Sequence, residues 1–189
     1  MGCATPPKDF SKSDRGSWRA KTLVQDKKLN RSYIVYIDIL ATKTNKLRMD
    51  VETSLGIHLA SLAYDSKELD IVLPQQKKFY SGSGRRATLS KMIPIDVRPE
   101  LIISFLFDEE AKDAGWKCNR GPKGALSDCF NVNGMKITWK KRMREQRVIA
   151  IESKRASIQM QLRGFNDSPE IKNEMFTIGR PSGYKRSKL

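Results

Sequence analysis

Apolar and polar residues alternate with a period of two through most of the chain from Trp18 onward. This period places successive side chains on opposite faces of an extended strand, so it predicts β-strands that bury one face. The alternation is cleanest in residues 46–52 and 157–163. There it gathers one set of apolar side chains on a common face: Leu47, Met49, Val51, Ile158, Met160 and Leu162.

Further strands are predicted at "SYIVYIDIL", "GIHLASLAY", "ELDIVL", "KKFYSG", "GWKC", "CFNV", "MKITWKK", "RVIAIES" and "MFTIG". Two short helices are predicted at "GRRATLSKMI" and "RPELIISFLF", and Pro99 suits the first turn of the second. About ten strands without a βαβ rhythm predict a mainly β fold with α (α+β), in which a strongly curved antiparallel sheet holds the helices against its concave side. Such a fold leaves a cavity wherever the inward side chains do not fill it.

Composition adds a strong positive charge to this picture. The 189 residues are enough for one domain with a substantial core, and their formal net charge is +15. This excess favours anionic partners such as phosphate backbones, acidic lipid headgroups or an acidic protein. The basic residues gather in residues 8–31, in "WKKRMREQR" and in "GRPSGYKRSKL", a spread that is equally typical of a solvated surface.

Candidate catalytic and metal-binding groups are sparse. His58 is the only histidine, and it lies within a predicted strand beside no obvious nucleophile. One histidine and no CxxC pair argue against a zinc site, and "GSGRR" lacks the spacing of a phosphate-binding loop. No nucleic-acid recognition motif accompanies the charge, although a basic nucleic-acid-binding protein is the alternative class. The sequence therefore predicts no enzyme, no cofactor and no nucleic-acid partner.

The three cysteines divide into a pair and a single residue. Cys118 and Cys129 flank a Gly- and Pro-containing segment that can fold back as a loop, so the two can meet. In an oxidising compartment a bridge over so short a loop would stabilise the fold by about 3 kcal/mol. Cys3 is left over, and at an extreme terminus it is better explained by modification than by structure.

Three regions are predicted along the chain. Residues 1–16 contain prolines, serines and charges with little to bury, so we predict a flexible tether. Residues 17–183 carry the strands and helices of the domain, and residues 184–189 form a basic tail. Methionines in or near the predicted strands suit a binding surface for flexible apolar chains, and they suit ordinary core packing equally well.

The order of several segments resembles the LolA/LolB superfamily of bacterial lipoprotein-sorting proteins, with LolB-like outer-membrane receptors the most similar. The resemblance begins in "NKLRMDVETSLGIHLASLAYDSKELDIVLPQQKKFYSG" and continues through "MIPIDVRPELIISFLF", "AGWKC" and "ITWKKRMREQRVIAIESKRASIQMQLRGF". "MFTIGRPSG" is similar to the ending of LolA-like carriers. The resemblance covers residues from about 18 to 183 and implies an incomplete β-barrel of about eleven strands, whose helices cap a hydrophobic cavity.

The resemblance also implies a function. An outer-membrane lipoprotein of this kind receives lipoproteins from a periplasmic LolA-like carrier, holds their acyl chains or phospholipids in its cavity, and takes part in their insertion into the membrane. A carrier of another lipid or glycolipid on the same fold is the alternative. The positive charge would suit anionic headgroups. The resemblance extends the predicted cavity lining to Leu59, beside the strand residues given above.

Two positions acquire specific roles from the resemblance. Gly2 and Cys3 look like the end of a lipobox, which implies lipid attachment at Cys3 and a location on the periplasmic side of the outer membrane. The rival interpretation is eukaryotic myristoylation and palmitoylation, for which Pro6 is the wrong residue. Leu55 and Gly56 match the loop whose exposed leucine helps LolB-like proteins insert lipoproteins into the membrane, with Ser54 in place of the family's proline. An ordinary turn leucine packed on the core is the alternative.

Overall fold

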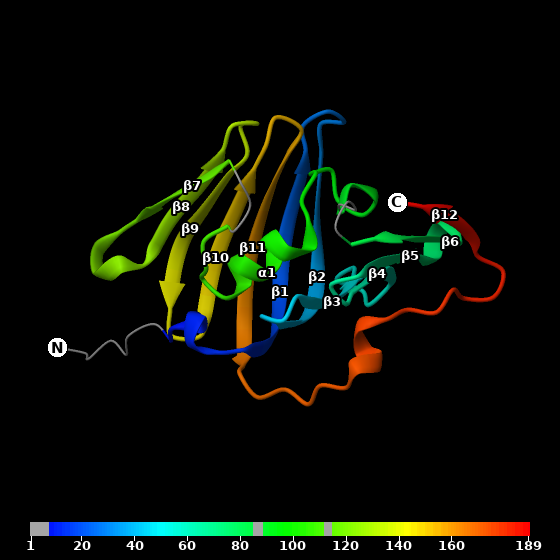
Figure 1. Cartoon of the computed structure of the whole chain (residues 1–189). Helices are drawn as coiled ribbons and strands as arrows, with labels where there is room; N and C mark the ends of the chain where they lie inside the picture. The colour runs from blue at the N-terminus through cyan, green and yellow to red at the C-terminus, as the bar shows by residue number, and fades with distance from the viewer. Residues whose placement is uncertain (1–7, 85–88, 112–114) are drawn as a thin grey trace.

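The computed structural model describes residues 8–84, 89–111 and 115–189 (Figure 1). These residues form one 12-stranded sheet with the order β12-β6-β5-β4-β3-β2-β1-β11-β10-β9-β8-β7. The strands are β1 (Arg15–Asp26), β2 (Arg31–Thr42), β3 (Lys46–Glu52), β4 (His58–Tyr64), β5 (Glu68–Leu73), β6 (Lys78–Ser83), β7 (Trp116–Arg120), β8 (Leu126–Asn131), β9 (Lys136–Met143), β10 (Gln146–Glu152), β11 (Ala156–Asn166) and β12 (Lys185–Lys188). The described helical elements are α1 (Pro99–Leu106) and the short 3₁₀ turns η1 (Phe10–Lys12), η2 (Pro74–Gln76), η3 (Leu89–Lys91), η4 (Pro122–Gly124) and η5 (Asn173–Phe176).

The sheet is strongly curved and does not close. Its two outermost strands, β7 and β12, lie at opposite ends of the strand order and do not pair with each other. Strands β3–β6 turn out of the plane of β1, β2 and β11, and α1 lies in the hollow that results (Figure 1). The predicted mainly β fold with an unclosed, curved sheet is confirmed, with 12 strands where the resemblance implied about eleven.

Two long strands form the centre of the sheet. Strands β1 and β2 pair in register from Arg15 opposite Thr42 to Asp26 opposite Arg31. In the turn between them, Asp26 Oδ1 accepts hydrogen bonds from the backbone N–H groups of Lys28 and Leu29, at 2.9 and 3.0 Å. This Asx-type turn fixes the register of the hairpin, which in turn fixes which side chains face the concave side.

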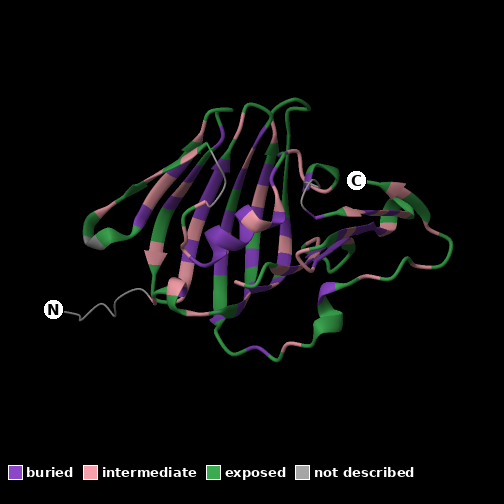
Figure 2. Ribbon diagram, viewed as in Figure 1, coloured by how far each residue is buried: buried purple, intermediate pink, exposed green. Residues whose placement is uncertain are grey.

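The concave face of the sheet is apolar and its convex face is mostly polar. Burial alternates residue by residue along β1, β3 and β11, as the striped strands in Figure 2 show. Seven of the eight residues of α1 are buried, because the curved sheet wraps around a helix whose only polar side chains are Glu100 and Ser104. Pro99 occupies the first helical turn, as predicted.

Aromatic side chains fill one end of the concave face. Trp18 and Phe165 stack with ring centroids 5.1 Å apart, Phe10 lies 4.1 Å from Phe165, and Phe107 meets Trp18 edge-on at 5.3 Å. Each such pair stabilises the fold by about 0.5–1.5 kcal/mol beyond the contribution of the apolar area that it buries. This cluster explains why residues 8–16 differ from the flexible tether predicted for them: Phe10 is completely buried and holds them on the domain.

The C-terminal region also differs from the prediction in two places. The strand predicted at "MFTIG" is absent, and residues 173–176 instead form η5, whose Phe176 is buried. Strand β11 pairs with β1 on one side and with β10 on the other, so the chain cannot add a strand beside it. The chain crosses instead to the edge of the sheet formed by β6. There residues 185–188, predicted as a basic tail, pair in parallel with β6 as β12.

Candidate functional site

An apolar cavity of about 280 Å³ lies between the concave face of the sheet and the segment from η3 to α1. Strands β1–β5, β10 and β11 together with η2 supply one wall, and residues 89–93 with Ile102 of α1 supply the other. Its lining residues are Thr22, Val24, Tyr33, Val35, Ile37, Met49, Val51, Leu59, Ala60, Leu73, Gln75, Gln76, Leu89, Lys91, Met92, Ile93, Ile102, Ile151, Ile158 and Met160.

The cavity exists because the two ends of the concave face carry side chains of different size. At one end the aromatic rings of Phe10, Trp18, Phe107 and Phe165 occupy the space under the sheet. At the other end the inward residues are aliphatic or methionine apart from Thr22, and a cavity remains between them and the covering segment. The space under the curved sheet is therefore filled by side chains at one end and contains a cavity at the other.

The mouth of the cavity is polar and its interior is apolar. Tyr33, Gln75, Gln76 and Lys91 are the exposed members of the lining, so they mark the opening. Burial and the nearby Asp26 carboxylate raise the pKa of the Tyr33 hydroxyl, which therefore stays neutral in the physiological range. This arrangement suits an amphipathic ligand whose apolar part enters and whose polar head stays at the mouth.

The structure brings most of the predicted lining residues together. Five of them line the cavity: Met49, Val51, Leu59, Ile158 and Met160. Leu47 and Leu162 are completely buried in the core but do not line the cavity. Sequence reasoning missed Val35 and Ile37, because the segment "SYIVYIDIL" is apolar on both faces and its period does not show which face turns inward.

The loop between β3 and β4 presents Leu55 to solvent. Its side chain is 86% exposed, and Ile57 beside it is 48% exposed. The Thr53 hydroxyl accepts hydrogen bonds from the backbone N–H groups of Leu55 and Ile57, at 3.2 and 3.1 Å. Gly56 has a φ of 77°, a left-handed conformation that glycine adopts without strain. The structure thus excludes the alternative in which Leu55 packs on the core.

His58 lies beside a hydroxyl that sequence reasoning did not anticipate. Its Nε2 is 2.9 Å from the Oγ of Ser61, and that hydroxyl donates to the Asp50 carboxylate, which also binds Arg48. In a Ser-His-Asp triad the imidazole stands between the carboxylate and the hydroxyl, whereas here Ser61 stands between them. The hydroxyl proton is directed to Asp50, so this cluster does not activate Ser61 as a nucleophile.

This cluster gives a testable pH dependence. Burial acts to raise the pKa of Asp50, but hydrogen bonds from Arg48 and Ser61 outweigh it and hold that pKa below its usual value. A carboxyl with a depressed folded-state pKa stabilises the fold above its unfolded pKa of about 3.9, and this contribution disappears as the pH falls through the folded value. We expect thermal unfolding to show a loss of Tm below about pH 4 that is smaller in Asp50→Asn. Equal losses in both proteins would contradict this assignment.

A larger open groove of about 730 Å³ lies at residues of β1–β3 and η5, away from the apolar cavity. Both arginines of its lining are paired: Arg48 with Asp50 of the groove at 2.8 Å, and Arg19 with Glu52 beside the groove at 2.5 Å. Because both arginines are paired and the groove is open to solvent, the smaller and more enclosed cavity is the better candidate for a ligand site.

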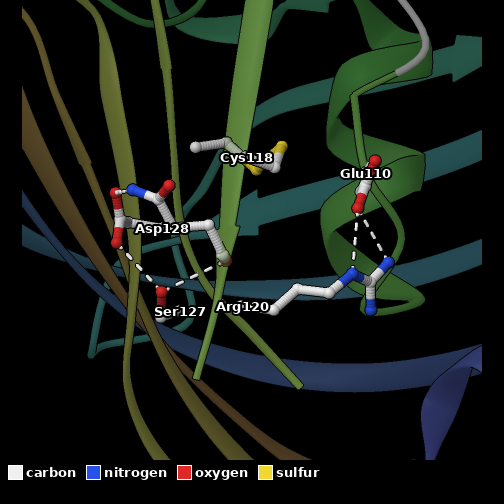
Figure 3. Close-up of a disulfide and its surroundings, with 7 residues drawn as sticks. Glu110, Cys118, Arg120, Ser127 and Asp128 are labelled. Carbon is white, nitrogen blue, oxygen red and sulfur yellow. Dashed lines mark hydrogen bonds and ion pairs between the residues drawn. A yellow bond between two sulfur atoms is a disulfide. The ribbon is translucent and has the colours of Figure 1, made fainter. Parts of the chain in front are cut away.

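Cys118 and Cys129 form a disulfide that joins β7 to β8 at one edge of the sheet (Figure 3). Beside it, Arg120 binds Glu110 at 2.7 Å, and the Ser127 hydroxyl donates to the backbone oxygen of Asn119 at 3.1 Å. The disulfide and the Ser127 hydrogen bond hold the edge hairpin together, and the ion pair joins it to the segment that follows α1. Cys3, the predicted lipid-attachment residue, lies outside the described residues.

The described residues offer neither a metal centre nor a membrane-spanning helix. Among them, no group of three His, Cys, Asp or Glu side chains is arranged to hold a metal ion. None of the helices formed by these residues has the length and apolar character needed to cross a membrane.

Comparisons with known proteins identify the fold. No protein-family model matches the sequence, and no curated protein matches it either. A solved structure of a LolA superfamily protein from Nitrosomonas europaea superimposes with a TM-score of 0.56 at 10% identity, over 88% of this chain and 91% of that one. The chain has a LolA-like fold. A DUF1329 family protein from Desulfovibrio piger is similar at a TM-score of 0.55 and 8% identity, over 89% of this chain and 91% of that one. At such identities the likeness concerns the arrangement of the LolA-like sheet and helix.

Proposed function

We propose that this LolA-like protein binds acyl chains in its apolar cavity and takes part in lipoprotein transfer to the outer membrane. The observation that carries the proposal is the cavity itself: it is enclosed by aliphatic and methionine side chains, and it opens through a polar mouth. Burying a methylene group in such a site is worth about 0.8 kcal/mol. A chain of several methylenes therefore gains enough free energy to leave water without any covalent step.

Other features support a carrier and not an enzyme. The hydroxyl and histidine closest to a catalytic arrangement are in the wrong order, and they do not line the cavity. The net charge of +15 would attract the acidic surface of a periplasmic LolA-like donor, or anionic headgroups of the membrane. A lipid on Cys3 would keep the protein on the periplasmic side of the outer membrane, where the disulfide between Cys118 and Cys129 suits the oxidising compartment.

The size of the cavity favours a second candidate function, the transport of a lipid with a single acyl chain. A water molecule takes up about 30 Å³ in the liquid, and at that volume for each group 280 Å³ holds roughly nine groups of methylene size. One acyl chain of medium length fits this space, whereas the several chains of a lipoprotein anchor need more. A carrier of a single-chain lipid on the same LolA-like fold is therefore the alternative, unless the segment from η3 to α1 moves outward.

Native mass spectrometry of protein purified from bacterial membranes tests the proposal. We expect a non-covalent lipid or lipoprotein adduct that dissociates on denaturation, together with a covalent diacylglyceryl mass on Cys3. Empty protein, in a preparation that retains lipid on a known carrier, would overturn acyl-chain binding. A bound single-chain lipid without a lipoprotein adduct would favour the second candidate.

Leu55 provides a separate test of membrane contact. Leu55→Asp places a charge on a fully exposed apolar tip, so we expect at least a severalfold weaker association with vesicles that contain anionic lipid, and unchanged chain binding in the cavity. Val132, 87% exposed in the turn between β8 and β9, provides the matched control as Val132→Asp. If both variants bind vesicles like the unmodified protein in a sedimentation assay, Leu55 has no role in membrane contact.

A further inference from the structure

Thr22 is the one polar side chain among the fully buried residues that line the cavity in the described part of the chain. It is 1% exposed, and its Oγ1 has no hydrogen-bond partner among the described residues. A buried hydroxyl without a partner costs about 1–3 kcal/mol, so its presence here requires an explanation. Valine has nearly the same shape and would not incur that cost.

The neighbours of Thr22 explain why the protein itself supplies no partner. In the sheet, Thr22 of β1 lies directly opposite Val35 of β2 and opposite Met160 of β11. Both neighbours line the same cavity, and neither carries a group that pairs well with a hydroxyl. Because Thr22 itself lines the cavity, we infer that the partner of its hydroxyl belongs to whatever occupies that cavity.

The depth of Thr22 indicates which part of a ligand it meets. Tyr33 marks the mouth and pairs with Val24, two positions from Thr22 along β1. At about 3.4 Å for each residue of a strand, Thr22 lies roughly 7 Å inside the mouth. The head of an amphipathic ligand rests at the mouth near Lys91, so Thr22 faces the chain and not the head.

We propose that the Thr22 hydroxyl forms a hydrogen bond with an oxygen carried on the acyl chain of the ligand, and that the preferred ligand is a hydroxylated acyl chain. A ligand hydroxyl can either donate to Thr22 or accept from it, so one hydrogen bond satisfies both buried groups. An unsubstituted chain leaves Thr22 unpaired and binds more weakly. This inference rests on the proposed acyl-chain site and names its ligand class.

The test is a displacement titration with decanoic acid and with hydroxydecanoic acids whose hydroxyl is moved along the chain. A fluorescent fatty acid serves as the displaced probe. In the unmodified protein we expect one hydroxyl position to bind about three- to tenfold more tightly than plain decanoic acid, the worth of one neutral hydrogen bond. Thr22→Val should remove this preference and should bind plain decanoic acid at least as well. Thr22→Ser, which keeps the hydroxyl and loses the methyl group, should retain the preference.

Two results would overturn the inference. One is an unmodified protein that binds decanoic acid without preferring any hydroxyl position, and the other is a preference that survives Thr22→Val. Both leave acyl-chain binding intact, so they are distinguishable from failure of the proposed function, in which no chain displaces the probe. Circular dichroism checks the fold of each variant, and Thr22→Val should unfold at the same or a higher temperature because it removes an unpaired hydroxyl.

Discussion

Replacing Ala60 with tryptophan should abolish most acyl-chain binding. Ala60 is buried, lines the cavity and pairs with Val51 on the concave face, so an indole ring at this position points into the empty space. If the ring displaces about four methylene groups at about 0.8 kcal/mol each, binding weakens by about 3 kcal/mol, more than a hundredfold in Kd. Titration with a fluorescent fatty acid measures this loss directly.

The control for Ala60→Trp is Gln159→Trp. Gln159 precedes Met160 on β11, and its exposed side chain lies on the opposite face of the sheet. The same ring added there should leave the affinity within about twofold, since a surface change far from the ligand rarely exceeds 0.5 kcal/mol. Unchanged binding in a folded Ala60→Trp protein would show that the chain lies elsewhere, and the open groove near Arg19 and Arg48 would become the leading site.

Of the substitutions proposed here, Arg147→Ala should lower the free energy of unfolding the most. Arg147 is 1% exposed, and its guanidinium donates to Asp108 at 2.9 Å and to the backbone oxygen of Gln146 at 3.0 Å. It also donates to the backbone oxygen of Lys8 and lies 3.8 Å from the centre of the Phe10 ring. Its removal takes a donor from these acceptors, and among the described residues the ion pair left to Asp108 is the longer one of 3.5 Å with Arg142. We expect unfolding in urea to reveal a loss of about 3–5 kcal/mol.

Two comparisons make the Arg147 result specific. Arg147→Lys keeps the charge but lacks the planar fork that reaches Asp108 and the carbonyl groups together, so its loss should be intermediate. Arg155→Ala, at an exposed arginine before β11, should change stability by no more than about 0.5 kcal/mol. A loss below about 1 kcal/mol in Arg147→Ala would mean that water replaces the guanidinium and that residues 8–12 do not depend on it.

The Arg147 site also shows where sequence reasoning reached its limit. Arg147 belongs to "WKKRMREQR", a basic run that by composition is typical of a solvated surface. Its burial depends on Asp108, 39 positions away, and on the carbonyl of Lys8, 139 positions away. Contacts over such separations do not affect local periodicity, so neither the buried ion pair nor the anchoring of Phe10 was predictable from the sequence.

By itself, the sequence determined the type of most elements and the inward face of the strands with strict alternation. Strict alternation in residues 46–52 and 157–163 reflects the two-residue period of a strand, and Pro99 indicates the start of a helix, so both were predictable from local chemistry. The tertiary structure alone decided which inward residues face empty space. Met160 lines the cavity while Leu162, two positions along the same face, is packed in the core, because the rings of Phe10, Trp18, Phe107 and Phe165 fill only one end of the curved sheet. A cavity forms where side chains from elements distant in sequence do not fill the space between them, so it exists only once those elements are assembled.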